Sequence, residues 1–433
     1  MGMEADFVMK QLKFGDRGPL VALLQTALTR AGFRPGASDG IFGSRTREAV
    51  IAFQRAQGLS PDGIAGKNTQ QALMPWYTGY AVHTVCAGDS LYKLARAYGS
   101  TLRAVELANP GVDAQNLRIG STVIVPLPFP VVPTDVPFGS TALGFSVRGL
   151  AARYPFLTLS DAGSSVMGTP LYTLAFGTGE KQVLYNASHH ANEWITTPLL
   201  LRFLEKLCAA YAAGDGIAGY SAQALFSAVT LTVVPMVDPD GVDLVVGELT
   251  GGSYYDAARR YAANYPQIPF PSGWKANIQG VDLNLQYPAE WEQAREIKFA
   301  QGYTGPAPRD FVGTAPLTAP ESRAMYELTR TLSPALTLSY HTQGKTIYWK
   351  FLDYNPPRSE EIGRRFAEAS GYALEETPYA SGFAGYKDWF IQDFGRPGYT
   401  IEAGAGTNPL PVSQLPEICR DNVPILVLGM ALA

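Results

Sequence analysis

Hydrophobic and polar positions follow three different patterns along this chain. Between residues 12 and 74, apolar side chains recur every three or four positions, most clearly over 19–31 and 46–57. This is the period of an amphipathic helix. Between residues 80 and 127, two short strand-like runs flank two short helical patterns. From about residue 150 onward, longer apolar runs of strand length alternate with helical patterns. The chain is therefore expected to be multidomain.

The third pattern predicts an α/β domain over residues 140–433. Its clearest strands are Gln182–Tyr185, Ala335–Tyr340 and Gly398–Ile401, and a helix is expected from about Thr197 to Tyr211. Chains in which strand and helix patterns alternate form mixed, largely parallel sheets covered by helices.

The second pattern predicts a small α+β domain over residues 80–127. A strand at His83–Val85 is followed by a helix that opens at Gly88–Ser90, where an Asp or Ser side chain can cap it. A second short helix spans Thr101–Ala108, and a closing strand spans Thr122–Pro126. The expected order is strand, helix, helix, strand.

The first pattern predicts a compact three-helix domain over residues 10–76. It contains an internal repeat, because the turn Asp39–Gly43 recurs as Asp62–Gly66, and each copy precedes a helical run. Between the small α+β domain and the α/β domain, prolines recur through residues 128–139. Proline-rich segments are stiff and extended, so we expect a linker there.

Composition excludes several classes of function. The chain has 433 residues, 17% of them charged, with a net charge of -4, so it lacks the basic surface typical of nucleic-acid binding. Three scattered cysteines are too few for a disulfide framework. The N-terminal residues contain no apolar signal-peptide core, and the apolar run 423–433 is too short to span a bilayer. We expect neither a nucleic-acid partner nor a membrane anchor.

The candidate chemistry begins at a strand-to-helix turn. His190 and Glu193 are three residues apart there, a spacing that puts both side chains on one side of a helical turn. A hydrolytic zinc ion needs three protein ligands and one open position for water. Of the four histidines, His341 closes a buried strand, where ligands gather in α/β folds. We expect it to be the third ligand, with His189 as the competing candidate. On its own an HxxE pair is a weak signal.

The pair belongs to an ordered series of motifs. His190-Ala-Asn-Glu-Trp-Ile195 resembles the zinc-binding segment of carboxypeptidase A-like metallopeptidases, and further landmarks of that family follow in its order. These are Pro239–Gly241, Gly280–Asn284, Ser339–His341 and Tyr399–Glu402. The resemblance implies a central eight-stranded mixed sheet between helices, and one Zn²⁺ ion per catalytic domain held by His190, Glu193 and His341.

The same resemblance implies the catalytic groups. Glu402 would be the base that takes a proton from the attacking water and passes it to the leaving amine. Lys275 falls where the family usually has an arginine that stabilises the oxyanion. Tyr379 resembles the family's substrate-covering tyrosine, with Tyr386 as an alternative.

One departure from the family bears on the substrate. Asn284 is kept, but Leu285 stands where true carboxypeptidases have an arginine that grips the substrate's C-terminal carboxylate in two hydrogen bonds. We therefore do not expect simple carboxypeptidase activity. The chain resembles family members that cleave the bond between γ-linked D-glutamate and meso-diaminopimelate in bacterial stem peptides. Candidates for binding the diaminopimelate carboxylates are Arg295, Arg309 and Arg323. The alternatives are a zinc peptidase acting on other peptides and a non-catalytic wall-binding protein.

The two small domains resemble bacterial wall-binding modules. Residues 10–76 resemble the helical peptidoglycan-binding domain, and residues 80–127 resemble a LysM domain, which binds glycans containing N-acetylglucosamine. The implied partners are peptidoglycan glycan strands and stem peptides. The residues implied to contact sugar are Gly88, Asp89, Ser90, Asn109 and Pro110. We expect a cell-wall, extracellular or spore-associated protein, or, since no signal peptide is visible, one in the cytoplasm of a sporulating cell.

Overall fold

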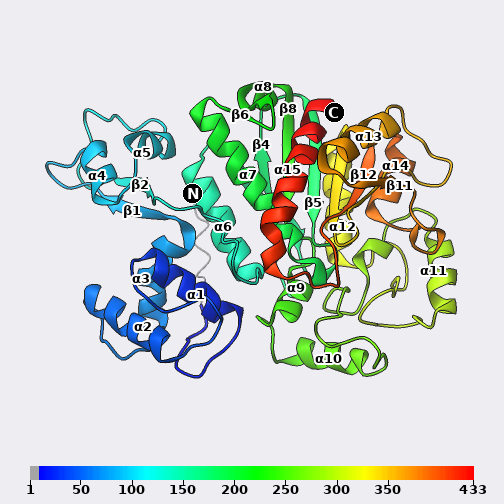
Figure 1. Ribbon diagram of the computed structural model, residues 1–433, viewed down its shortest axis with the longest axis horizontal. Coiled ribbons are helices and arrows are strands. Elements are labelled where there is room, and N and C mark those ends of the chain that lie inside the picture. The colour runs from blue at the N-terminus through cyan, green and yellow to red at the C-terminus, as the bar shows by residue number, and fades with distance from the viewer. Residues whose placement is uncertain (1–8) are drawn as a thin grey trace. The chain divides into compact units, whose positions relative to one another are not determined.

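The computed structural model describes residues 9–433, which separate into two compact units (Figure 1). The first unit comprises the described residues up to Pro137 together with Gly144–Pro155. The second comprises Phe138–Leu143 and Phe156–Ala433. One helix, α6 (Ser140–Arg153), contributes residues to both units. No helix within residues 9–433 combines the length and the apolar character needed to cross a membrane.

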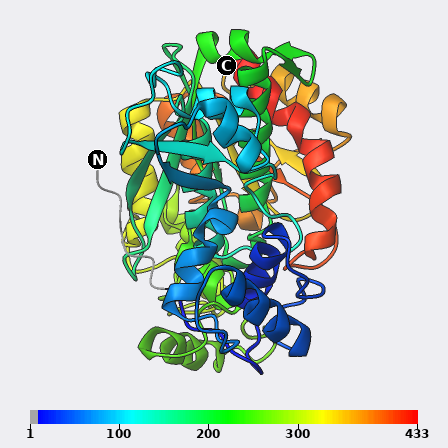
Figure 2. The ribbon, with the colours of Figure 1, turned by 90° about the vertical axis from the view of Figure 1, so that its left-hand side faces the viewer.

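The first unit begins with the expected helical region. It consists of α1 (Pro19–Arg30), α2 (Ser44–Ala56) and α3 (Lys67–Thr78). These helices are drawn in blue in Figure 2. Apolar residues at helical spacing fill the space between them, as predicted, and Leu24, Leu28, Val50, Phe53 and Leu73 are fully buried.

The internal repeat of this region is a repeated hydrogen-bond network. The side-chain amide of Gln25 donates to Asp39, to the Ile41 carbonyl and to Thr46, and its oxygen accepts from the Gly40 N–H. In the second copy, Gln54 makes the same four contacts with Asp62, Ile64, Thr69 and Gly63. The two turn glycines need the left-handed backbone region, with φ of 71° and 75°.

The second module has the predicted order of strand, helix, helix, strand. Its elements are β1 (Tyr80–Thr84), α4 (Leu91–Ala97), α5 (Leu102–Ala108) and β2 (Thr122–Pro126), and the two strands pair antiparallel. Both helices begin at a hydroxyl cap, since Ser90 accepts from the Lys93 N–H and Thr101 accepts from the Ala104 N–H.

The second unit is built on the predicted mixed sheet. Among the described residues this sheet has eight strands in the order β11-β10-β12-β9-β5-β8-β4-β3. Neighbours β12, β9, β5 and β8 run parallel, whereas β10, β4 and β3 join through antiparallel pairs. The strands are β3 (Thr158–Ser164), β4 (Pro170–Phe176), β5 (Lys181–Ala187), β8 (Val229–Val234), β9 (Leu336–His341), β10 (Thr346–Tyr348), β11 (Ala373–Glu375) and β12 (Gly398–Glu402).

Helices cover both faces of the sheet. The hydroxyl of Tyr185 on β5 donates to the Leu426 carbonyl of α15, whereas the neighbouring Leu184 packs in a cluster with Met325 of α12 and Trp389 of α14. Adjacent strand residues point to opposite faces, so α15 lies on one face and α12 and α14 on the other. The helices of this unit are α7 (Thr196–Ala213), α8 (Ala222–Ala228), α9 (Pro239–Val246), α10 (Ser253–Ala262), α11 (Trp291–Ala300), α12 (Pro320–Leu332), α13 (Ser359–Ser370), α14 (Tyr386–Phe394) and α15 (Leu415–Leu432). A small hairpin joins β6 (Gly216–Ile217) to β7 (Tyr220–Ser221), and short 3₁₀ turns span Ala191–Glu193, Leu283–Leu285, Tyr379–Ser381 and Val412–Gln414.

Candidate metal and catalytic site

The site forms at the carboxyl ends of the central parallel strands. The register pairs Glu402, the last residue of β12, with His341, the last residue of β9, and pairs Tyr340 with Ala187 at the end of β5. The chain leaving β5 reaches His190 three residues later. Residues that are far apart in the sequence therefore meet at one edge of the sheet, where ligands of α/β proteins usually bind.

The turn that follows β5 is fixed by buried hydroxyl groups. Ser188 has a positive φ of 53°, and its N–H donates to the Thr196 hydroxyl. The Ser188 and Thr197 hydroxyl oxygens lie 2.9 Å apart, and Thr197 donates to the Pro235 carbonyl. The 3₁₀ turn Ala191–Glu193 then places Glu193 beside His190. These contacts hold the turn rigidly before any ligand binds.

Three side chains converge on one point. His190 Nδ1 lies 3.0 Å from Glu193 Oε1 and 3.1 Å from His341 Nδ1, and His341 Nδ1 lies 2.9 Å from Glu193 Oε2. All three side chains are buried. A zinc ion with ligand bonds of about 2.0–2.1 Å places neighbouring ligand atoms about 3.3 Å apart. The donor types and spacings fit such an ion, and among the described residues these three form a group that could hold a metal.

Asp282 orients one of these histidines. Its Oδ1 lies 3.2 Å from His190 Nε2, the ring nitrogen that does not face the cluster, and its Oδ2 accepts from the Asp310 N–H. Burial opposes ionisation, but His190 and Lys275 hold the pKa of Asp282 well below its usual range. Burial also disfavours the charged His190 ring, yet the Glu193 and Asp282 carboxylates outweigh it and raise the pKa of His190 to about 9. Histidine ligands of metals commonly have such a carboxylate on their second nitrogen.

His189, the competing candidate ligand, lies outside this cluster. Its ring is fully buried, and its Nε2 is 3.0 Å from the Tyr287 hydroxyl. Burial, together with the neighbouring histidines, lowers the pKa of His189 well below its ordinary value. The structure gives it the contacts of a neutral packing histidine.

Glu402 and Lys275 lie next to the cluster. Lys275 Nζ is 3.4 Å from Glu193 Oε1. Burial and then the negative charge of Glu193 raise the pKa of Glu402 to about 8, although Lys275 and His190 act in the opposite direction. A carboxylate whose pKa is near neutrality is suited to exchanging protons with water and with an amine.

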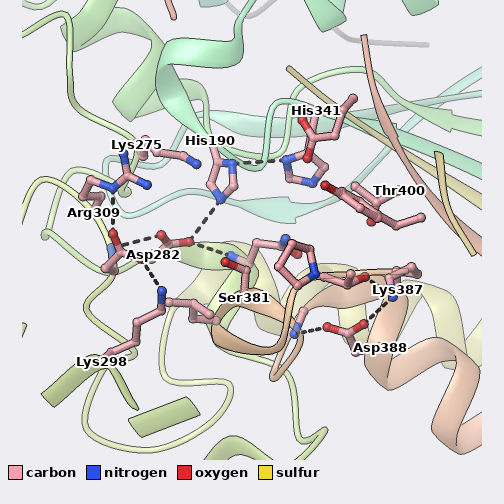
Figure 3. A pocket seen from close by; sticks show the side chains of 18 residues that line it. His190, Lys275, Asp282, Lys298, Arg309, His341, Ser381, Lys387, Asp388 and Thr400 are labelled. Atoms are coloured by element: carbon pink, nitrogen blue, oxygen red, sulfur yellow. Dashed lines mark hydrogen bonds and ion pairs between the residues drawn. The ribbon is translucent and has the colours of Figure 1, made fainter. Parts of the chain in front are cut away.

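A cavity of about 220 Å³ opens in front of these groups (Figure 3). It is lined by His190, Lys275, Asp282, Asn284, Leu285, Lys298, Arg309, Asp310, His341, Tyr348, Thr377, Pro378, Ser381, Gly385, Lys387, Asp388, Thr400 and Glu402. The predicted substrate contacts Asn284 and Leu285 are among them. The side-chain oxygen of Asn284 accepts from the Tyr386 N–H and is held in place by it.

The two candidate tyrosines have different surroundings. Tyr379 is 67% exposed on the short turn Tyr379–Ser381, whose Ser381 lines the cavity, and its ring packs edge-on against Phe383. Tyr386 is fully buried, and its hydroxyl lies 2.8 Å from that of Thr329. Neither tyrosine is among the residues that line the cavity, and of the two only Tyr379 is exposed to solvent.

Of the three candidate arginines, Arg309 alone lines the cavity. Arg295 packs over Trp291 on α11, and Arg323 is exposed on α12. Sequence reasoning missed the other charged groups of the cavity wall, which are Lys298, Asp310, Lys387 and Asp388. They come from helices and loops that show no local motif, so only the fold brings them together.

The predicted sugar-contacting residues lie together in the small α+β module. Asp89 accepts from the Cys86 N–H and lies 2.9 Å from His83 Nε2, and the Asn109 side chain bonds β2 at Ile124. Ser90 caps α4 as described above. Gly88 and Pro110 are exposed. Asp89, Ser90 and Asn109 therefore shape the loops, and the exposed backbone beside them is available to a ligand.

The domain has a mixed β-sheet covered by helices, and a His–Glu–His cluster at its edge lies beside a glutamate and a lysine. This is the organisation of a metal-dependent hydrolase. Family models agree with this class: residues 146–425 match the zinc carboxypeptidase model, residues 17–73 a peptidoglycan binding domain and residues 83–126 a LysM domain. The chain belongs to the zinc carboxypeptidase family. Its family implies a zinc-dependent peptidase, and its two small domains indicate binding to peptidoglycan and association with the cell wall.

Two relatives match the greater part of the chain. Gamma-D-glutamyl-L-diamino acid endopeptidase 1 of Lysinibacillus sphaericus is 44% identical over 288 residues, which cover 66% of this chain and 70% of the relative. YqgT of Bacillus subtilis (strain 168) is 39% identical over 285 residues, covering 65% of this chain and 74% of the relative.

The fold is shared with solved carboxypeptidase structures. The carboxypeptidase A of Helicoverpa armigera superposes with a TM-score of 0.54 at 17% identity, covering 90% of this chain and 88% of the other. Bovine thrombin-activatable fibrinolysis inhibitor superposes with a TM-score of 0.52 at 17% identity, covering 69% of this chain and 98% of the other. At such identities the likeness concerns the fold alone.

Proposed function

We propose that this protein hydrolyses the amide bond between γ-linked D-glutamate and meso-diaminopimelate in the stem peptides of bacterial peptidoglycan. The observation that carries the proposal is the charge of the cavity. Leu285 lines the cavity where family carboxypeptidases have an arginine for a C-terminal carboxylate. Four basic side chains line it elsewhere, beside four carboxylates; the basic ones are Lys275, Lys298, Arg309 and Lys387, and the carboxylates are Asp282, Asp310, Asp388 and Glu402. Stem peptides have several carboxylates that are not C-terminal. The relative from Lysinibacillus sphaericus is named for this type of bond.

His190, Glu193 and His341 would hold the zinc ion. When bound, the ion would polarise the scissile carbonyl and make water more acidic. Glu402 would accept a proton from the attacking water and deliver it to the leaving amine. Lys275, whose ammonium lies 3.4 Å from Glu193, would place positive charge near the oxyanion that develops. A lysine acts there as a point charge and not as the two-pronged donor that an arginine provides.

Arg309 supports recognition of an anionic substrate. Its Nε lies 2.6 Å from Asp310 Oδ2, and its side chain is 42% exposed. The Asp310 N–H also donates to Asp282, which contacts His190. The guanidinium is therefore tied to the ligand cluster through two carboxylates, and its terminal nitrogens would form a bidentate pair with a substrate carboxylate.

The two wall-binding domains would raise the local concentration of substrate. A tether of this kind converts each later encounter with the wall into an intramolecular event, without changing the chemistry of the bond cleaved. The proposed location of the protein is accordingly the cell wall.

The test is mass spectrometry of L-Ala-γ-D-Glu-meso-diaminopimelate peptides, with and without terminal D-Ala, after incubation with the zinc-loaded protein. Release of L-Ala-D-Glu that a chelator abolishes is the expected result. An α-linked isomer of the same peptide serves as the control and should stay intact. Removal of only the terminal residue would refute the argument from Leu285 and indicate a carboxypeptidase.

A further inference from the structure

A buried ion pair forms part of the cavity wall. Lys387 and Asp388, near the start of α14, both line the cavity. Their charged atoms lie 2.5 Å apart, and each side chain is only 4% exposed. Figure 3 shows the pair on the side of the cavity away from Lys275 and Arg309.

Stability alone gives little reason for such a pair. A buried ion pair is usually no more stable than apolar side chains of similar volume, because desolvation offsets the attraction. Part of its surroundings is structural, since Lys387 donates to the Lys350 carbonyl and to Thr377, and Asp388 Oδ2 accepts from the Gly385 N–H. Asp388 is contacted by the Lys387 ammonium on Oδ1 and by the Gly385 N–H on Oδ2, which uses two of the roughly four lone-pair positions of a carboxylate. Acceptor capacity is thus left over at the cavity wall.

A second charged group of the cavity, centred on Asp310, differs from this pair. Asp310 is contacted by two cations, Lys298 on Oδ1 at 2.7 Å and Arg309 on Oδ2 at 2.6 Å, whereas Asp388 is contacted by one. Two cations around one carboxylate leave an excess of positive charge, which suits a plain carboxylate. The Lys387–Asp388 pair is balanced, and it presents one positive and one negative charge side by side. Its complement is a group that also has both charges.

Resting on the function proposed above, we propose that Lys387 and Asp388 form the subsite for the distal amino-acid end of the diaminopimelate side chain. The carboxylate of that end would pair with Lys387 and its ammonium with Asp388. A lysine at the same substrate position has only the ammonium, which Lys387 would repel. The pair would therefore select diaminopimelate over lysine without contacting the bond that is cleaved.

The experiment uses four tripeptides, L-Ala-γ-D-Glu-X, and the zinc-loaded full chain. X is meso-diaminopimelate, lysine (distal ammonium only), 2-aminopimelate (distal carboxylate only) or norleucine (neither charge). For the unmodified protein, kcat/KM for diaminopimelate should exceed that for lysine by about ten- to a hundred-fold, the range for a hydrogen bond to a charged group. Lys387→Met should reduce kcat/KM by a similar factor for diaminopimelate and 2-aminopimelate but not for lysine. Asp388→Asn should reduce it for diaminopimelate and lysine but not for 2-aminopimelate.

Two controls separate recognition from loss of folding. Ratios of kcat/KM between substrates are measured on one preparation, so they do not depend on the folded fraction. Lys350→Met removes a lysine that pairs with Glu376 outside the cavity lining, and it should leave the ratios between the four substrates unchanged. An equal loss on all four tripeptides in Lys387→Met and Asp388→Asn would show that the pair only supports the fold, and would overturn the subsite. Equal cleavage of the diaminopimelate and lysine peptides by the unmodified protein would overturn it too, while leaving the proposed bond intact. Absence of cleavage of all four γ-linked tripeptides would overturn the proposed function itself.

Discussion

Asp282→Asn tests whether the carboxylate behind His190 prepares the metal site. Asp282 is 4% exposed, and both of its oxygens face N–H donors, from Asn284 and His190 on Oδ1 and from Asp310 on Oδ2. An amide cannot satisfy all of these, because its NH₂ group must face one of the donors. The substitution removes the negative charge beside His190 while keeping the size of the side chain.

Two estimates of the effect agree. Losing a hydrogen bond to a charged partner costs about 1.5–3 kcal/mol. Loss of such a carboxylate partner typically weakens metal binding by about 10- to 100-fold, which equals about 1.4–2.7 kcal/mol. We therefore expect the dissociation constant for Zn²⁺ to rise 10- to 100-fold, with most activity restored at saturating zinc.

The assay is competition between the metal-free protein and a chromophoric zinc chelator at fixed pH. Asp310→Asn is the matched control, because Asp310 pairs with Lys298 and Arg309 and contacts Asp282 only through its backbone N–H. It should change zinc affinity less than threefold, a span of about 0.7 kcal/mol. A folded Asp282→Asn protein with zinc affinity within twofold of the unmodified chain would refute the role given to Asp282.

Three further outcomes follow from the site and its surroundings. Glu402→Gln should retain zinc, measured by elemental analysis, and lose about 10²- to 10⁴-fold in kcat; undiminished turnover would exclude Glu402 as the base. A zinc chelator should abolish hydrolysis and added Zn²⁺ should restore it, whereas activity that persists in demonstrably zinc-free protein would contradict the metal chemistry. Burial raises the pKa of Glu248 to about 7, although hydrogen bonds from Thr141 act to lower it. The folded state then holds this proton more tightly than the unfolded state, so stability falls as pH rises from about 4.5 through about 7 and is level above that. Glu248→Gln should therefore reduce the loss of unfolding free energy between pH 5 and pH 8 by about 2.5 kcal/mol, followed by tryptophan fluorescence in urea; an unchanged pH profile would show that Glu248 does not titrate in this range.

The layout of the fold and of the metal cluster could be predicted because both have a local signature. Apolar runs of strand length marked β5, β9 and β12, and the residues that end or follow them were candidates for that reason. The cluster that could hold a metal consists of the same three residues, His190, Glu193 and His341. Parallel pairing explains this, because it brings the ends of neighbouring strands to one edge of the sheet.

The remainder of the cavity could not be predicted in this way. Lys387 and Asp388 sit near a helix start and Lys298 sits within α11, and nothing in the spacing of these residues indicates a shared cavity. The sequence pattern also did not indicate which side chains near the site would be buried. Tyr379 and Tyr386 are similar as sequence positions, yet one is 67% exposed and the other fully buried, because only the second packs against the sheet through α14. Such differences depend on long-range packing and not on local pattern.

The duplicated glutamine network of the first helical region has a practical consequence for engineering. In each copy, a glutamine on a helix bonds the turn that follows that helix. The segment that joins the helix to the turn is longer after α1 than after α2. The same network thus forms after segments of two different lengths. The stretch between Gly32 and Ser38 is therefore a favourable place to insert a fluorescent reporter or an affinity tag, because added surface-loop length costs little once the ends are fixed.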